Sequence, residues 1–195
     1  TGALGCVGAW TVRALVREGT PVVGFDLGTN ARRLAQILGP DELDDLTLIE
    51  GDITDLGAIE RAIDEHGITN VVHLAALQVP FCRADPPRGA AVNVLGTVNV
   101  FEAVRRRGIT GAPIAYASSL AAYSLADVDP VTGRLEEDAT QTPVNHYGVF
   151  KVANEGTRIV PGSGPVMSFA DLKAHQAMYL KIFDRLQTLF TEARD

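Results

Sequence analysis

The sequence predicts an α/β fold in which helices cover both faces of a doubly wound parallel sheet. Short apolar runs alternate with stretches of helical periodicity over residues 1–159, which is typical of successive strand–helix–strand units. The runs are apolar almost throughout, as expected of strands that are buried on both faces. The length of 195 residues fits one domain of this class together with an extension.

The first half of the chain supplies three helix–strand pairs. Apolar positions at helical spacing predict helices at residues 7–18, 31–38 and 56–66. Each is followed by a glycine stop signal, at Gly19, Gly39 and Gly67. Apolar runs that end in polar residues predict strands at 21–26, 46–49 and 71–75.

The second half continues the pattern and then departs from it. A Pro-rich loop around Pro80, Pro86 and Pro87 precedes the elements of this half. These are a long helix at 89–107, a strand at 112–117, a polar loop at 126–143 and a helix at 146–159. We therefore expect a first domain over 1–159, a breaker-rich linker over 160–166 and an amphipathic helix over 167–195.

Charge and composition exclude several classes of function. The net charge of −7 argues against a nucleic-acid partner, because phosphate backbones select basic surfaces. No run of about 18 apolar residues predicts a membrane span. Two cysteines are too few for a disulfide framework, so we expect a reduced, cytoplasmic setting. The four histidines show no ligand spacing, and no metal site is expected.

A glycine-rich loop opens the chain. Gly2, Gly5 and Gly8 form a G-x-x-G-x-x-G pattern, with Cys6 and Val7 between the last two glycines. Such a loop allows the backbone to approach a pyrophosphate at the amino end of the following helix. A glycine cluster alone also fits an ordinary turn, so the pattern needs a second observation.

Asp26 supplies that observation. It ends the second predicted element, 18 residues after Gly8 (26 − 8 = 18), where a carboxylate can accept hydrogen bonds from the adenosine ribose. A carboxylate there repels a 2′-phosphate, which favours NAD over NADP. Arg32 and Arg33 follow closely and soften this preference, so NADP stays open as the less favoured cofactor.

Tyr147 and Lys151 form a Y-x-x-x-K pair whose side chains share one helix face. An ammonium beside the phenol, together with a positively charged nicotinamide, favours phenolate and allows Tyr147 to act as a general acid/base. Ser118 and Ser119 follow a hydrophobic strand, where a hydroxyl can hold the substrate oxygen against Tyr147. Each of these features also occurs in purely structural roles; their combination indicates an active site.

Taken in order, these motifs resemble the extended short-chain dehydrogenase/reductases over residues 1–158. The resemblance is carried by Thr1-Gly2-x-x-Gly5-x-x-Gly8, Asp26, Gly51-Asp52-Ile53, His73-Leu74-Ala75-Ala76, Asn93-Val94-x-Gly96-Thr97, Ala117-Ser118-Ser119 and Tyr147-x-x-x-Lys151. It implies a Rossmann-like domain that binds NAD.

The resemblance also implies roles for single residues. Asp52 and Ile53 are expected to flank the adenine, and Leu74, Ala75 and Ala76 to line the cofactor beneath its phosphates and ribose. Asn93 matches a structural asparagine of the long helix. Because Tyr123 lies four residues after it, Ser119 is preferred over Ser118 as the catalytic serine.

The function that follows is an NAD-dependent oxidoreductase or epimerase acting on a hydroxyl of a sugar nucleotide or sugar-derived substrate. Ser119-Leu120 stands where dehydratases of the family carry Asp-Glu, which favours epimerase or dehydrogenase chemistry. The alternatives are a non-catalytic dinucleotide-binding module and an inactive fragment.

The sequence departs from the family pattern at both ends. No strand precedes Thr1, so we expect an incomplete sheet whose two halves lack direct pairing. After Arg158 the family continues into a substrate-binding lobe, whereas 160–195 matches nothing familiar. The expected helix there packs on its own domain or pairs with a second copy. The resemblance also suggests a homodimer through the helices near 89–107 and 146–159.

Overall fold

The computed structural model describes residues 1–44, 46–109, 114–135 and 139–155. Helices and strands alternate through most of this range, in the order α1 (Cys6–Arg17), β1 (Val23–Asp26), α2 (Arg32–Ala35), α3 (Pro40–Asp44), β2 (Thr47–Glu50), α4 (Leu56–His66), β3 (Val72–His73), α5 (Val79–Ala84), α6 (Pro86–Ala90), η1 (Ala91–Gly96), α7 (Thr97–Arg106), β4 (Ala115–Tyr116), η2 (Leu120–Ala122), η3 (Leu125–Asp127) and α8 (His146–Glu155). The expected linker at 160–166 and helix at 167–195 lie outside the described residues.

The described residues form two separate two-stranded sheets, and the strands in each are parallel. β1 pairs with β2, and β3 pairs with β4. Thr1 and Gly2 lie between the two pairs: Thr1 N donates to Val72 O at 2.7 Å, and Gly2 N donates to Phe25 O at 2.9 Å. The spatial order is therefore β2–β1–(Thr1–Gly2)–β3–β4. This arrangement confirms the incomplete doubly wound sheet.

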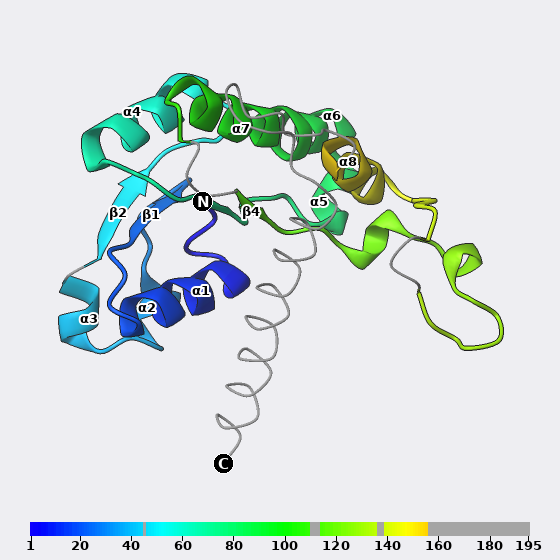
Figure 1. The fold of residues 1–195 in the computed structure, drawn as a ribbon, viewed down its shortest axis with the longest axis horizontal. Coiled ribbons are helices and arrows are strands. Elements are labelled where there is room, and N and C mark those ends of the chain that lie inside the picture. Colours follow the sequence, from blue (N-terminus) through cyan, green and yellow to red (C-terminus); the bar gives the residue numbers. More distant parts are fainter. Residues whose placement is uncertain (45, 110–113, 136–138, 156–195) are drawn as a thin grey trace, which may run out of the picture. The chain divides into compact units, whose positions relative to one another are not determined.

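Helices cover both faces of this arrangement, and each face has its own apolar core (Figure 1). On one face, α1 and α2 pack Ala9, Val12 and Leu34 against the strands. On the other, α4 and α7 enclose a core of Phe25, Ile53, Ile59, Ile63, Val100, Ala103 and Val104. α4 begins at an aspartate cap, where the Asp55 carboxylate accepts from Ala58 N at 3.1 Å, and ends at the left-handed Gly67.

The long helix expected at 89–107 is present but is not a regular α-helix. It runs from Pro86 to Arg106 as α6, a π-helical turn η1 and α7. A π-turn inserts an extra residue into the helix and is common at functional sites. Here it contains Asn93, which is 2% exposed.

Three short helices differ from the sequence prediction. The Pro-rich loop expected around Pro80, Pro86 and Pro87, before Gly89, is wrong, because α5 and the start of α6 occupy these positions. Prolines at the first helical positions are compatible with a helix, since their missing N–H has no intrahelical partner there, and Asp85 caps α6 by accepting from Arg88 N. α3 similarly begins at Pro40, directly after the glycine at which the preceding helix was expected to end.

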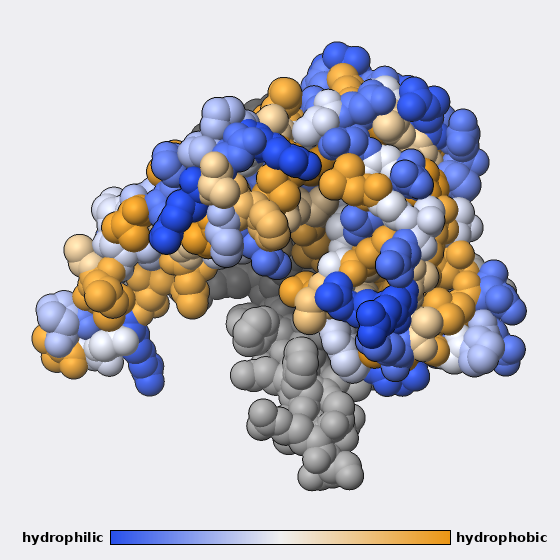
Figure 2. Space-filling view, turned by 180° about the vertical axis from the view of Figure 1, so that it is seen from behind, coloured by the Kyte–Doolittle hydropathy of each residue, from blue (hydrophilic) through white to orange (hydrophobic). Residues whose placement is uncertain are grey.

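The described residues between Ser119 and Asn145 form an irregular extension (right-hand side of Figure 1). It contains η2, η3 and an isolated bridge between Val128 and Leu135. Several of its large apolar side chains are exposed, namely Leu120, Leu125, Val131 and Val144. Figure 2 shows hydrophobic groups among hydrophilic ones on the projecting part of the molecule.

Candidate functional site

The glycine loop packs closely against its neighbours, and only glycine fits two of its positions. Gly2 has φ of 71°, and a Cβ there would lie 2.6 Å from Ala75 N. A Cβ at Gly8 would overlap the carbonyl oxygen of Gly2. Gly5 N closes the turn onto Gly2 O at 3.1 Å, and α1 starts at the next residue, Cys6. The loop therefore brings bare backbone and the amino end of α1 to one place.

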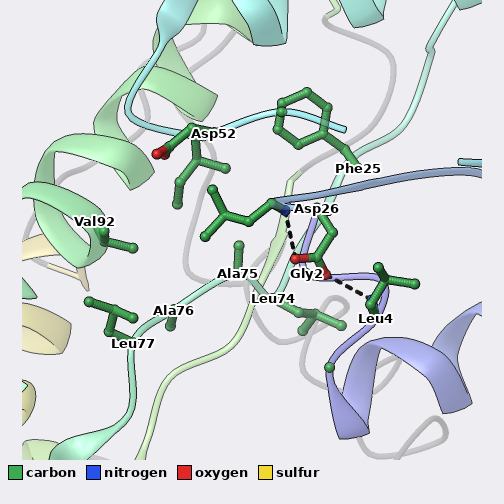
Figure 3. Close-up of a pocket in the computed structure, with 14 residues that line it drawn as sticks. Gly2, Leu4, Phe25, Asp26, Asp52, Leu74, Ala75, Ala76, Leu77 and Val92 are labelled. Atoms are coloured by element: carbon green, nitrogen blue, oxygen red, sulfur yellow. Dashed lines mark hydrogen bonds between the residues drawn. The ribbon is translucent and has the colours of Figure 1, made fainter. Parts of the chain in front are cut away.

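A cleft of about 340 Å³ opens beside this loop (Figure 3). Eight residues expected to bind cofactor line it: Gly2, Gly5, Asp26, Asp52, Ile53, Leu74, Ala75 and Ala76. The other residues expected to bind cofactor are not among the lining residues, namely Cys6, Val7, Gly8, Asn93, Tyr147 and Lys151. Gly8 is buried under the loop, while Cys6 and Val7 are exposed on α1.

Sequence reasoning did not assign the remaining lining residues, which are Leu4, Phe25, Leu27, Gly51, Leu77 and Val92. Most of them lie next in sequence to a residue that was assigned. The end of each parallel strand contributes several consecutive residues to the edge of such a sheet. Extending each motif by one residue on either side would have found Leu27, Gly51 and Leu77.

Asp26 lies at the carboxyl end of β1, where its side chain faces the glycine loop (Figure 3). One carboxylate oxygen accepts from Leu4 N and the other from Leu27 N, each at 2.8 Å. These two bonds fix the side chain but leave further lone pairs, because a carboxylate has about four acceptor positions. Arg33 also reaches the loop, donating from Nη1 to Leu4 O at 2.6 Å. Asp26 and the basic side chain of Arg33 thus both contact Leu4, which lines the cleft.

The opposite wall of the cleft is fixed by buried residues. Ile53 is 5% exposed and contacts the position of Gly96 in the π-turn. The Asp52 carboxylate accepts from Thr54 N at 2.8 Å. Asn93 reaches the segment after Ala76: its Oδ1 accepts from Leu77 N at 2.7 Å, and its Nδ2 donates to Leu77 O at 2.8 Å. Asn93 therefore shapes the cleft wall from behind.

Ser119, Tyr147 and Lys151 come together at the junction of β4, η2 and α8. Ser119 hydrogen-bonds the Tyr147 phenol, and the Lys151 ammonium lies 5.6 Å from the centroid of the Tyr147 ring. Glycine at 148 makes this possible, because a Cβ there would overlap the Ala121 carbonyl of η2. Ser118 is exposed and Ser119 partly buried, which agrees with the choice of Ser119.

The protonation of Tyr147 differs from the sequence expectation. Burial raises the pKa of Tyr147, and the hydrogen bond to Ser119 offsets this only in part. In this arrangement the phenol keeps its proton at neutral pH and is ready to donate it. The lowered pKa expected from Lys151 and a nicotinamide together stays a prediction.

A buried histidine links the two halves of the site, and sequence reasoning assigned it no role. His73 is fully buried between Thr1 and Thr97, with Nδ1 2.6 Å from Thr1 Oγ1 and Nε2 3.0 Å from Thr97 Oγ1. Thr97 Oγ1 donates its only proton to Asn93 O at 2.8 Å, so His73 Nε2 must carry the hydrogen in their bond. Burial is the largest cause that lowers the pKa of His73, to about 3. The imidazole is therefore neutral near pH 7.

Two negative findings concern only the residues that the structure describes. Within them, no three His, Cys, Asp or Glu side chains are grouped as a metal ion would need. Across the same ranges, every helix is too short or too polar to cross a bilayer.

A parallel sheet wrapped on both faces, with a glycine loop and an acidic strand end at one cleft, defines a dinucleotide-binding fold of the Rossmann type. The family model described as "NAD dependent epimerase/dehydratase family" matches residues 1–157. The chain belongs to this family.

Several named relatives are similar to the chain over about 80% of its length. UDP-glucuronate 4-epimerase 2 of Arabidopsis thaliana is 33% identical, and the match covers 80% of this chain and 36% of that protein. UDP-glucose 4-epimerase of Neisseria gonorrhoeae is 30% identical, with 80% of this chain and 45% of that protein covered. The chain thus spans less than half the length of these relatives.

Solved structures give the same picture. The Thermus thermophilus UDP-glucose 4-epimerase complex with NAD has a TM-score of 0.66 at 28% identity, covering 80% of this chain and 47% of that one. The Bordetella bronchiseptica enzyme WbmG in complex with NAD and UDP has a TM-score of 0.63 at 30% identity, covering 80% and 46%. An L-threonine dehydrogenase from Cupriavidus necator reaches 0.68 at 26% identity, covering 80% and 47%.

Proposed function

We propose that the chain is the cofactor-binding part of an NAD-dependent epimerase that acts on a hydroxyl group of a sugar nucleotide. The observation that carries the proposal is the grouping of Ser119, Tyr147 and Lys151. They occur in a fold whose glycine loop and Asp26 line a cleft, although none of the three lines that cleft itself. The relatives named UDP-glucose and UDP-glucuronate 4-epimerases support the substrate class.

The residues of the cleft fit NAD. Gly2 and Gly8 leave no room for a Cβ, so the loop presents backbone close to the amino end of α1, where a pyrophosphate is stabilised. Asp26 keeps free acceptor positions for ribose hydroxyls, and Ile53 and Leu74 offer apolar walls. When bound, NAD would accept hydride from the substrate carbon and return it.

The catalytic residues then divide the proton chemistry. Ser119 would hold the substrate oxygen through its hydroxyl, beside the phenol. Tyr147 would take the proton of the substrate hydroxyl as hydride leaves the same carbon, and would return it when the carbonyl is reduced. Lys151 would favour the phenolate form and hold the nicotinamide ribose. Return of hydride to the opposite face of the carbonyl gives epimerisation.

A simple dehydrogenase is the second candidate. It is suggested by the similarity to the L-threonine dehydrogenase from Cupriavidus necator, which has a TM-score of 0.68 at 26% identity. In that case the oxidised product leaves and reduced cofactor accumulates.

Cofactor binding is tested first, by titrating the chain with NAD in a calorimeter and with NADP as the control. We expect saturable binding that favours NAD. In Asp26→Ala this preference should fall by at least tenfold, because the carboxylate that repels a 2′-phosphate is gone while Arg33 remains beside Leu4. An Arg33→Ala variant is the matched control and should favour NAD more strongly. An unchanged NAD to NADP ratio in Asp26→Ala contradicts the assigned role of Asp26.

Turnover is tested with UDP-glucose, UDP-glucuronate and L-threonine as separate substrates. Interconversion of 4-epimers without net cofactor reduction supports the epimerase, and a stoichiometric rise in absorbance at the wavelength of reduced nicotinamide supports the dehydrogenase. Tyr147→Phe should remove turnover while NAD still binds. Turnover retained in Tyr147→Phe overturns the role of Tyr147.

The proposed homodimer through 89–107 and 146–159 is compatible with the surface of these helices. Leu95 and Val98 are 53% and 42% exposed on the long helix, and Val149 is 48% exposed on α8. Exposed aliphatic side chains on neighbouring helices are typical of a helix-pairing surface.

A further inference from the structure

A buried cluster behind Lys151 contains two residues to which no role has been assigned, Tyr116 and Asn154. Lys151 is only 4% exposed, and its ammonium donates to Ala117 O at 2.7 Å. The same nitrogen lies 4.5 Å from the centroid of the Tyr116 ring, closer than its 5.6 Å from the Tyr147 ring. Burying an ammonium is costly unless acceptors and polarisable groups replace its water. We call the Ala117 carbonyl and the Tyr116 ring together the ammonium site.

The Tyr116 ring is itself held from two sides. The His73 imidazole stacks on it, with centroids 5.6 Å apart and an interplanar angle of 21°. Asn154 Nδ2 donates to the Tyr116 hydroxyl at 3.2 Å. Because His73 is neutral, it stacks on the ring without adding a second cation beside Lys151.

Asn154 lies on the same face of α8 as the catalytic pair, at i, i+4 and i+7 with Tyr147 and Lys151. Its Nδ2 also donates to Asn93 O at 2.6 Å. Because the Asn93 carbonyl oxygen can only accept a hydrogen bond, the NH2 group of the Asn154 amide must face the π-turn. The amide therefore joins α8 to the long helix and to the Tyr116 ring at the same time.

The carbonyl that Asn154 contacts lies in the π-turn. Asn93 O accepts from two side chains, Thr97 Oγ1 at 2.8 Å and Asn154 Nδ2 at 2.6 Å. The bond from Thr97 is the i−4 bond that a helical threonine commonly makes. The bond from Asn154 comes from another helix, α8, and therefore connects α8 to the π-turn.

We propose that Tyr116 and Asn154 are positioning residues that hold the Lys151 ammonium beside Tyr147, Tyr116 through its ring and Asn154 by fixing that ring and α8 to the π-turn. This inference rests on the proposed function, since it assigns the two residues to the reaction through Lys151. Neither residue contacts the reacting atoms. Asn154 Oδ1 is also buried and has no hydrogen-bond partner among the described residues. The hydrogen bonds of this amide in the cluster are therefore those that Nδ2 donates.

The test uses the full chain labelled with ¹³C in its lysines, of which there are three, Lys151, Lys173 and Lys181. Lys151→Met assigns the signal of Lys151 by its loss. Ring currents from Tyr116 should place the ε-methylene protons of Lys151 upfield of their position in the urea-unfolded chain. Tyr116→Leu should return the signal towards that unfolded position, and Tyr116→Phe should keep most of the upfield shift.

Asn154→Leu is the second variant, and Tyr123→Phe is the matched control, because Tyr123 lies outside the cluster. We expect Asn154→Leu to reduce the upfield shift of Lys151 and to weaken NAD binding in the calorimeter, while Tyr123→Phe changes neither. Circular dichroism verifies that each variant is folded.

An unshifted Lys151 signal in the wild-type chain overturns the ammonium site, whatever the variants do. So does an upfield shift that survives in folded Tyr116→Leu, because the Tyr147 ring would then be its source. Failure of the proposed function looks different: Tyr147→Phe would retain turnover while the Lys151 signal stays shifted.

Discussion

Because His73 is buried in its neutral form, the free energy of unfolding should decrease as pH falls. The decrease per pH unit follows from the difference between the folded and unfolded pKa of His73. The unfolded chain binds a proton on His73 near pH 6.5, whereas burial lowers the pKa in the folded state to about 3. A lowered folded-state pKa means that the contribution is fully present above pH 6.5 and is lost as pH falls towards 3. Below pH 6.5 each pH unit removes about 1.4 kcal/mol, so the loss from pH 7.5 to 5.0 is about 2 kcal/mol.

The measurement is the free energy of unfolding in urea at several pH values between 7.5 and 5.0. His73→Gln keeps a donor at the Nε2 position towards Thr97 but cannot titrate, so its pH slope should be shallower than that of wild type by about 2 kcal/mol over this range. His66→Gln alters an exposed histidine and is the matched control. The carboxylates and the Thr1 amino group titrate in all three proteins. Their contributions to the pH slope therefore cancel when the slopes are compared. Equal slopes in wild type and His73→Gln would refute the reasoning.

Three further predictions concern packing, polar satisfaction and assembly. Gly148→Ala should destabilise the protein by about 1–3 kcal/mol, because its Cβ would overlap a backbone carbonyl of η2. Gly28 has open space around it, so Gly28→Ala should change the free energy of unfolding by less than about 1 kcal/mol in the same urea titration. Asn93→Leu should cost about 1–3 kcal/mol, because Leu77 N loses its acceptor and Leu77 O keeps only the weak thiol donor of Cys82 at 3.4 Å. Exposed Asn70→Ala should not have this cost, and equal urea midpoints of the two variants contradict the prediction. Val98→Glu should shift a dimer to monomer in sedimentation velocity, and a wild-type chain that is monomeric throughout argues against the helix interface.

The elements with strong sequence periodicity were predictable. α1, α4 and the strands β1 and β2 lie within about two residues of their expected positions, because amphipathic spacing and glycine stop signals act locally. The shared cleft position of Asp26 and the glycine loop follows from the parallel topology, in which strand ends meet at one edge. The family membership shown by residues 1–157 agrees with the order of motifs.

The features that sequence reasoning missed depend on contacts between distant residues. α5 is a short helix and α6 begins the long helix, and the prolines at the start of both resemble loop signals. For α6, the Asp85 cap is the signal that indicates a helix instead. Nothing in the local pattern around Asn93 indicates a π-turn, since its stabilising partners lie 16 residues before it and 61 residues after it. His73 reads as part of an apolar strand, and only the fold places it between two threonines.

Asn93 connects the cleft beside the glycine loop to α8, the helix that carries Tyr147 and Lys151. Its side chain holds both backbone groups of Leu77, which lines the cleft. Its carbonyl oxygen holds Asn154 on α8, one helical turn beyond Lys151. The side chain and the backbone carbonyl of one residue in the π-turn thus link the cleft wall to α8.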